Sequence, residues 1–317
     1  MTPDRFRPGR PAGPDQARAR RAGIAAIAVT SVLWGTTGTA ATFAPEVGPL
    51  AIGAAAHGIA GLLQALVALP GARAAQPALR RSAGTIALGA LAVAIYPLAF
   101  YSSMRLAGVA VGTVVSLAAA PLAAAVYEKV VDQRRLGWPW ALAATLGTVG
   151  GALVCLVRGS GQTASSQGMA GGILLGLVAG ATYAGYSWAV RRTMARGVPR
   201  RAAMGAIFGV GGAALVPVLV VTGAPLVESA KAFAVASYMV TVPMFAGYLL
   251  FSYGLVRVPA STATTVTLIE PAVAAVLAVA VVGERLAAGA WCGLGLIGLA
   301  LVILVASPPT EDPLPPG

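Results

Sequence analysis

Apolar residues lie along the chain in ten long stretches, separated by short segments that contain charged residues, proline or glycine. The stretches span residues 24–44, 49–70, 83–104, 108–127, 138–157, 169–190, 202–222, 233–255, 259–282 and 287–307. Each is close in length to the roughly 20 apolar residues that an α-helix needs to cross the hydrocarbon core of a bilayer. The pattern therefore predicts an all-α integral membrane protein with ten transmembrane helices, embedded in a lipid bilayer.

Composition narrows the class of protein further. Of the 317 residues, 57% are hydrophobic and only 10% are charged, whereas a soluble domain carries about 25% charged residues. This excludes a water-soluble globule, and the presence of only two cysteines excludes a disulfide scaffold. Residues 1–22 are rich in Pro, Gly and Arg and are expected to form a disordered basic cytoplasmic tail, while residues 308–317 form a short Pro-rich tail.

The distribution of basic residues predicts the orientation in the membrane. The chain carries a net charge of +12, which by itself is also typical of nucleic-acid-binding proteins. If the N-terminus is cytoplasmic, 18 of the 22 Lys and Arg residues fall on the cytoplasmic side of the ten predicted spans. Cytoplasmic loops of membrane proteins carry such an excess. We therefore expect a multi-pass protein of the cell membrane with both termini in the cytoplasm and no nucleic-acid partner.

The two halves of the chain show a weak repeat at an offset of about 150 residues, in which Pro121–Val126 aligns with Pro271–Val276. The halves, residues 23–158 and 168–307, contain five predicted helices each. Because five is an odd number, the second half must have the opposite orientation in the membrane. Inverted repeats of this kind are typical of secondary transporters, which hold their substrate near the midplane between the halves.

Several motifs resemble those of a known family. Ser31–Gly38 is similar to a Trp-Gly motif in the first helix of the ten-helix EamA-type members of the drug/metabolite transporter superfamily. Leu268–Pro271 and Val282–Leu286 are similar to the ninth-helix signature and the Gly-Glu-Arg turn of the same family. The resemblance covers about residues 23–307. It implies two inverted five-helix repeats and a carrier that moves small metabolites such as amino acids, or drugs, often outward and without ATP hydrolysis.

Glu270 is the only charged residue within the predicted spans, and Ala120 stands at the matching position of the first half. A charged side chain at the bilayer centre costs roughly 2.5–3.5 kcal/mol on insertion scales, and a low dielectric favours the neutral form of a carboxyl group. Two interpretations follow. Either Glu270 lines a cavity, where it exchanges a proton or contacts a substrate amine, or it forms a hydrogen bond that stabilises a helix interrupted by Pro271.

Further residues of the spans are candidates for the same site. Pro121 and Pro271 occupy matched positions and are expected to break their helices near the binding region, although a kink that serves only packing is the alternative. The aromatic candidates for lining a cavity are Trp34, Tyr96, Tyr183 and Tyr248; anchoring at the membrane interface is the common alternative for tyrosine. The lone His57 is a candidate for proton or ligand binding, with a hydrogen bond to the backbone as the alternative.

These features predict a secondary transporter for a small-molecule substrate, an exporter of amino-acid-like or drug-like solutes that is proton-coupled through Glu270. A non-transport membrane protein, such as a lipid-carrier-processing enzyme or a receptor, is the alternative. The glycine-rich stretches lack the Gly-Lys-Ser/Thr ending of a phosphate loop, and one acid and one histidine in the spans do not suffice for a hydrolytic triad. No enzymatic activity, cofactor or metal is therefore expected.

Overall fold

The computed structural model describes residues 14–41, 43–107, 109–134, 136–158, 166–282 and 288–307. The elements follow one another in the order α1 (Pro14–Ala41), α2 (Pro49–Ala74), α3 (Gln76–Arg81), α4 (Ala83–Ala107), α5 (Val109–Val130), α6 (Trp138–Arg158), α7 (Ser166–Ala195), α8 (Arg200–Thr222), the 3₁₀ turn η1 (Ala224–Leu226), α9 (Ala230–Met239), the π-helical segment η2 (Val240–Ala246), α10 (Gly247–Leu255), α11 (Ala260–Val266), α12 (Ile269–Leu277), the π-helical segment η3 (Ala278–Val282) and α13 (Ala288–Ala306). The described residues are thus helical throughout, apart from short connections.

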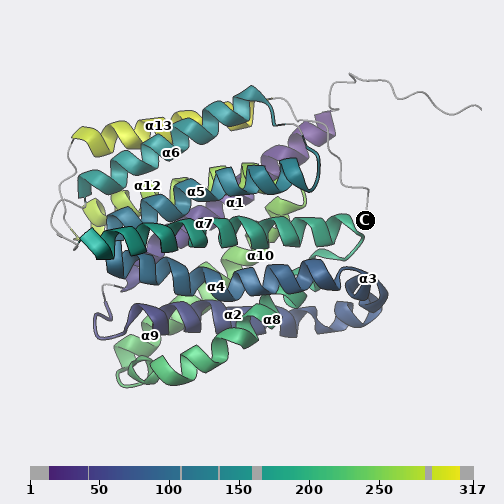
Figure 1. Ribbon diagram of the computed structural model, residues 1–317, viewed down its shortest axis with the longest axis horizontal. Coiled ribbons are helices and arrows are strands. Elements are labelled where there is room, and N and C mark those ends of the chain that lie inside the picture. Colours follow the sequence, from purple (N-terminus) through teal and green to yellow (C-terminus); the bar gives the residue numbers. More distant parts are fainter. Residues whose placement is uncertain are drawn as a thin grey trace, which may run out of the picture.

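The long helices lie side by side with their axes roughly aligned (Figure 1). Among the described residues, nine helical segments are long and apolar enough to cross a membrane, and the apolar part of α6, Trp138–Val154, is a shorter tenth one. The eighth span consists of α9, η2 and α10, and the ninth of α11, α12 and η3. Large apolar side chains such as Leu66, Val220 and Val221 are exposed on the outside, as expected for faces that contact lipid. The predicted fold class, an all-α membrane protein with ten transmembrane helices, is confirmed.

The packing of the helices reflects two inverted repeats of five. α2 packs against α8 and α6 packs against α13, and each of these pairs joins equivalent helices of the two halves. In the second half, α7 packs against α4 and α5, the third and fourth spans of the first half. Equivalently, α1 packs against α10 and α12, which belong to the third and fourth spans of the second half. The first helix of each half therefore packs mainly against helices of the other half, and the two repeats interlock.

Both ends of the described chain meet at one end of the bundle. Arg20, near the start of α1, donates a hydrogen bond from Nη1 to the carbonyl oxygen of Ser307, just after α13, at 3.0 Å. We call this the terminal end; it lies on the right in Figure 1 and also carries α3. The connections from α1 to α2 and from α8 to α9 lie at the opposite end.

The first helix begins earlier than the hydrophobic pattern predicts. α1 starts at Pro14, so the prediction of a disordered tail is wrong for residues 14–22. Proline suits the first position of a helix, Asp15 in the first turn interacts favourably with the helix dipole, and the Ala, Arg and Gln residues that follow are good helix formers. Residues 1–13, 283–287 and 308–317 lie outside the described residues, and with them the rest of both predicted tails and the Gly-Glu-Arg turn.

Close contact between α6 and α13 depends on glycine, and this gives a first prediction. A Cβ atom built on Gly293 would lie 2.5 Å from the carbonyl oxygen of Gly150, whereas one built on Gly295 would meet nothing within 4 Å. We expect Gly293→Ala to lower the melting temperature of the detergent-solubilised protein by several degrees, because α13 must move away from α6. Gly295→Ala is the matched control and should leave it unchanged or raise it, since alanine is the better helix former by about 1 kcal/mol. Equal effects of the two changes would contradict the packing argument.

Candidate functional site

The ninth span is interrupted directly before Glu270. α11 ends at Val266 and α12 begins at Ile269. Pro271 has no N–H group, so the carbonyl of Thr267 cannot form the usual hydrogen bond four residues ahead. Instead, the Glu270 N–H donates to the Thr267 carbonyl at 2.9 Å. Glu270 therefore lies in the first turn of α12, where the helix dipole favours a negative charge.

Threonine hydroxyls help to maintain this interruption. The hydroxyls of Thr264 and Thr265 donate to the Ser261 carbonyl at 3.1 and 2.8 Å, and that of Thr267 donates to the Thr264 carbonyl at 2.9 Å. Short polar side chains that bond to nearby carbonyls offer the backbone an alternative to the regular helix ladder. The break predicted at Pro271 is thus present.

The matching proline of the first half does not break its helix. Pro121 lies inside α5, which continues from Val109 to Val130. Leu117 stands four residues before Pro121, where Thr267 stands before Pro271. Ser116, five residues before Pro121, donates to the carbonyl of Gly112 at 2.7 Å within the continuous helix. The prediction of a helix break at Pro121 is therefore wrong, and the two halves differ at this point.

Buried aromatic rings form a continuous cluster at the centre of the bundle, which we call the aromatic cluster. Trp34 from α1 lies with its ring centroid 5.0 Å from that of Tyr248 and 6.1 Å from that of Tyr183. Tyr96 from α4 lies 5.7 Å from Tyr183 and 5.5 Å from the ring of His57. The four aromatic candidates and His57 therefore lie together, although they come from five different helices: α1, α2, α4, α7 and α10.

Hydrogen bonds link the hydroxyl groups of the aromatic cluster. The Tyr183 hydroxyl donates to Thr267 Oγ1, at the break of the ninth span, at 2.8 Å. The Tyr248 hydroxyl lies 2.9 Å from that of Tyr186 and 3.3 Å from Nε2 of His57. Tyr248 thus joins two helices through its oxygen, and the cluster is polar at its centre although its rings are apolar.

Trp34 also binds the irregular eighth span. Its Nε1–H donates to the carbonyl of Pro243 at 2.9 Å, and Thr30 Oγ1 donates to the carbonyl of Gly247 at 3.1 Å. Pro243 lies within the π-helical segment η2, and such segments occur frequently at functional sites. Two side chains of α1 therefore satisfy carbonyl groups at the irregular part of a helix from the other half.

Glu270 lies beside the aromatic cluster. Its N–H donates to the carbonyl of Thr267, whose hydroxyl accepts the hydrogen bond from Tyr183 of the cluster. The residue is partly buried, and its side chain forms no hydrogen bond or ion pair with another residue in the described part of the chain. Its location thus combines partial access with the absence of a fixed partner.

Gly35 explains why α1 approaches Glu270 so closely. A Cβ atom built on Gly35 would lie 2.9 Å from the carbonyl oxygen of Glu270 and 2.7 Å from Cβ of Val273. Only glycine fits this contact without a shift of one helix. The Trp-Gly pair of the sequence motif therefore has two distinct tasks: Trp34 joins α1 to the eighth span, and Gly35 lets α1 contact the ninth.

The bundle is closed on the terminal side of the aromatic cluster. Every residue from Tyr183 to Arg191 in α7 is buried, and so is every residue from Ala260 to Leu268. In residues 33–41 of α1, which correspond to 183–191 at the opposite end, only Trp34 and Gly35 are buried. Inverted repeats in equivalent conformations would bury equivalent segments equally, so this asymmetry shows that the bundle is packed more tightly at the terminal end.

A buried carboxylate contributes to the closure. Glu128, in the last turns of α5, is only 2% exposed. Its Oε1 accepts the Ser261 N–H at 3.1 Å, and its Oε2 accepts the Ser261 hydroxyl at 2.7 Å and lies 3.4 Å from Nη1 of Arg134. The carboxylate thereby caps the N-terminus of α11, where backbone N–H groups lack helical partners.

Two further contacts join helices at the terminal end. Arg191 is buried and donates from Nη1 to the carbonyls of Leu255 and Val258, at 3.0 and 2.9 Å. Trp188 donates from Nε1 to Oδ2 of Asp132 at 2.7 Å. We refer to the contacts of Glu128, Arg191 and Asp132 together as the polar seal, since they connect α5, α7, α10 and α11.

Three further residues take part that are not among the preferred site residues of the sequence. Glu128 follows the apolar stretch 108–127 and is therefore expected in a cytoplasmic loop, although an acidic residue at the edge of an apolar stretch beside basic residues is a detectable signal. Tyr186 lies one turn from Tyr183 and is a further tyrosine that could line a cavity, after the four preferred aromatic residues. Pro243 carried no specific prediction, yet it lies at the centre of η2.

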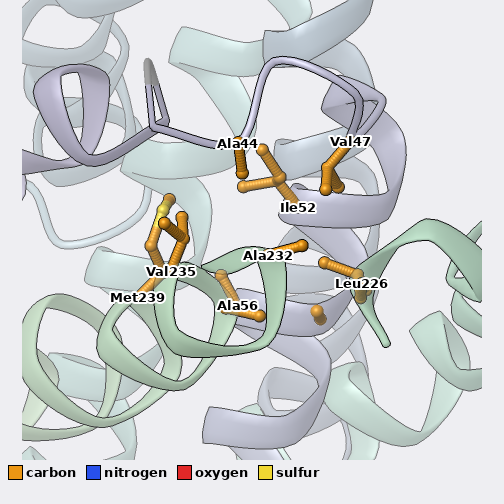
Figure 2. Close-up of a pocket in the computed structure, with 10 residues that line it drawn as sticks. Ala44, Val47, Ile52, Ala56, Leu226, Ala232, Val235 and Met239 are labelled. Carbon is orange, nitrogen blue, oxygen red and sulfur yellow. The ribbon is translucent and has the colours of Figure 1, made fainter. Parts of the chain in front are cut away.

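A small pocket near the opposite end lies outside this group of residues. Figure 2 shows that it is lined by side chains from the α1–α2 connection, α2 and the segment around α9: Ala44, Val47, Ile52, Ala55, Ala56, Leu226, Ala232, Val235, Ala236 and Met239. All are apolar, so the pocket offers no side-chain group that would orient a polar substrate. None of the candidate residues from the sequence lines it.

A ten-helix bundle with interlocked inverted repeats, interrupted spans and a polar centre has the architecture of a membrane transporter. The model of the EamA-like transporter family matches residues 170–306. An uncharacterised transporter of Bacillus subtilis (strain 168), YwfM, is 31% identical over 288 residues, which cover 89% of this chain and 93% of that protein. The chain belongs to the EamA-like transporter family, within the drug/metabolite transporter superfamily.

A solved structure shows the same fold. A crystal structure described only as that of a protein matches with a TM-score of 0.71, covering 87% of this chain and 94% of the other at 18% identity. The role follows from membership of the EamA-like transporter family: the protein is a multi-pass membrane transporter for a small-molecule substrate.

Proposed function

We propose that this transporter moves an amino-acid-like or drug-like solute out of the cytoplasm and exchanges it for protons through Glu270. The observation that carries the proposal is a partly buried glutamate in the middle of a membrane span, next to a helix break and without a fixed side-chain partner among the described residues. Such a group binds either a proton or a cationic group. Because it cannot hold both at once, it can exchange one for the other.

The aromatic cluster supports binding of the solute beside Glu270. In the proposal, Trp34, Tyr96, Tyr183 and Tyr248 form the wall of the substrate site. The faces of aromatic rings attract ammonium groups, and the tyrosine hydroxyls offer hydrogen bonds to polar groups of the solute. His57 holds the Tyr248 hydroxyl in place through Nε2 and acts as a positioning residue.

The two ends of the bundle fit an alternating mechanism. With the terminal end in the cytoplasm, the polar seal separates the site from the cytoplasm in this conformation, while the opposite end is the more open one. Equivalent helices of inverted repeats can exchange conformations, which would open the terminal end and close the other. Solute would leave and a proton would bind on the outside, and the proton would be released inside.

A transport assay tests the proposal. The full chain is purified, reconstituted in liposomes and screened with labelled amino acids and cationic drugs, with and without a pH gradient. Since solute and protons move in opposite directions, we expect accumulation in vesicles with an acidic lumen and its collapse on addition of a protonophore. Accumulation that ignores the gradient would contradict proton coupling, and accumulation in vesicles with an alkaline lumen would contradict exchange.

The orientation has its own test. In a chain with Cys155 and Cys292 replaced by alanine, exposed positions at the two ends are changed to cysteine, Glu46→Cys at the opposite end and Arg80→Cys at the terminal end. We expect a membrane-impermeant maleimide to label the first variant in intact cells and the second only after permeabilisation. The reverse pattern would overturn the proposed topology with cytoplasmic termini, which the excess of basic residues at the terminal end supports.

A further inference from the structure

Two arginines lie over one tyrosine ring at the terminal end, where α8 begins and α10 ends, and a third arginine is adjacent in the sequence. The guanidinium carbon of Arg257 lies 3.5 Å from the ring centroid of Tyr253, and that of Arg200 lies 5.8 Å from the same centroid. Arg201 is the next residue of α8 and is exposed. We call these four residues the arginine cluster. Stacking on an aromatic ring holds a guanidinium in place and leaves its edge available for hydrogen bonds. Arg257 uses Nη1 to donate to the Tyr253 carbonyl at 2.8 Å, and its remaining N–H groups can bind an oxyanion.

The positive charge of the cluster is not balanced locally. None of the three arginines forms an ion pair with a carboxylate in the described part of the chain; the ion pairs there involve Glu128 and Asp132. In addition, the residue before α8, Pro199, provides no side-chain cap, so the N–H groups of the first turn of α8 have no side-chain acceptor. A long helix start of this kind attracts anions.

The neighbouring helix α1 adds basic residues. α1 lies directly against the cluster, since a Cβ atom built on Gly23 would be 2.7 Å from Cβ of Arg257. The turn of α1 that precedes Gly23 carries Arg20 and Arg21. The cluster is therefore the convergence point of three helices, α1, α8 and α10, with a concentrated positive charge.

We propose that the arginine cluster binds the phosphate group of an anionic phospholipid. The cluster lies at the ends of apolar spans, where a transmembrane helix passes the headgroups and where tyrosine is enriched. Basic pockets between transmembrane helices bind anionic headgroups. A phosphate at this place contacts the edges of Arg257 and Arg201 while its acyl chains remain in the bilayer.

Arg200 connects the proposed lipid site to the aromatic cluster. Arg200 also donates from Nη1 to the Leu249 carbonyl at 3.0 Å and lies 3.4 Å from the Ser252 hydroxyl. Leu249 follows Tyr248 of the aromatic cluster. A phosphate that fixes Arg200 therefore stabilises the junction of α8 and α10 on the closed side of the bundle.

The test compares lipids on the purified full chain in a mild nonionic detergent. Phosphatidylglycerol or phosphatidylcholine is added, the melting temperature is measured, and retained lipid is counted by native mass spectrometry. We expect phosphatidylglycerol to raise the melting temperature by several degrees more than phosphatidylcholine does. In the double variant R201Q/R257Q, phosphatidylglycerol should bind about tenfold more weakly. The single variant R201Q changes an exposed side chain, so its weaker lipid retention is readable even if the double variant is unstable.

The matched control is R80Q/R81Q, which removes two exposed charges from α3 at the same end and should retain the lipid response. If both double variants lost the response to phosphatidylglycerol equally, the proposal would be wrong and the response would depend only on overall charge. If millimolar inorganic phosphate raised the melting temperature as much as phosphatidylglycerol does, the ligand would be a soluble anion and the lipid proposal would be wrong. Equal binding of both lipids by the wild type would also overturn the proposal. None of these outcomes depends on Glu270 or on transport.

Discussion

Glu270→Gln is expected to lower gradient-driven accumulation of substrate strongly and to weaken, without abolishing, exchange of labelled for unlabelled substrate across the membrane, because the aromatic cluster still contacts the solute. Glutamine keeps the size and hydrogen-bonding capacity of a protonated carboxyl group but cannot release a proton. Loss of a positioned proton-transfer group typically costs on the order of 100-fold in rate, and we expect a reduction of this order in accumulation at an acidic vesicle lumen. The measurement is uptake in proteoliposomes with and without the pH gradient, paired with a counterflow assay without it.

The control for this change is Glu46→Gln, the same substitution at an exposed position of the opposite end, which should transport normally. The structural interpretation of Glu270 makes the contrary prediction. If the carboxyl group serves only to stabilise the interrupted helix, glutamine supplies the same hydrogen bonds, and both accumulation and melting temperature stay at wild-type values. Gradient-driven accumulation by Glu270→Gln at the wild-type level would therefore refute the coupling role.

Glu128→Ala is expected to open the terminal end. The carboxylate of Glu128 receives two hydrogen bonds from Ser261 and pairs with Arg134, and hydrogen bonds to charged groups contribute about 1.5–3 kcal/mol each. Removing them destabilises only the conformation that forms them, so the balance between the two conformations shifts by on the order of 100-fold toward the terminal-open one. Ser187, which is fully buried in α7, serves as the reporter after its change to cysteine.

We expect a thiol reagent applied from the terminal side to modify Ser187→Cys much faster when Glu128→Ala is present. Lys129→Ala changes the adjacent, exposed residue and should leave the labelling rate as it is. Glu128→Gln, which retains an acceptor for the Ser261 N–H but loses the charge, should fall between the two. Identical labelling rates in all variants would show that the polar seal does not control access.

The fold follows from the sequence because one property, the length of apolar stretches, decides it. Each of the ten predicted stretches is mainly helical over its described residues, with a break before Ile269 in the ninth, since backbone groups in a bilayer must be paired within the helix. Residues 14–22 were assigned to a tail because helix formation there depends on propensity and end effects, which hydropathy does not report. Pro121 and Pro271 differ in the residue four positions earlier, which is Leu117 in the first half and Thr267, at the break, in the second.

The candidate site was harder to derive. Trp34, Tyr96, Tyr183, Tyr248 and His57 were selected because polar or aromatic groups are rare in the spans, and the structure brings them together. Glu128 is different in kind: its burial depends on the distant Ser261, and no local pattern shows which loop residue reaches across to another helix. The same limit applies to the arginine cluster, whose members come from different helices.

The interlocked packing of α1 and α7 has a consequence for how the chain is made. The main packing partners of α1 are α10 and α12, which are synthesised near the end of the chain. The final packing of α1 therefore forms late. The first helix of each half packs mainly against helices of the other half. Neither half therefore contains the packing partners of its own first helix, and we expect the two halves to fold together and not as separate units.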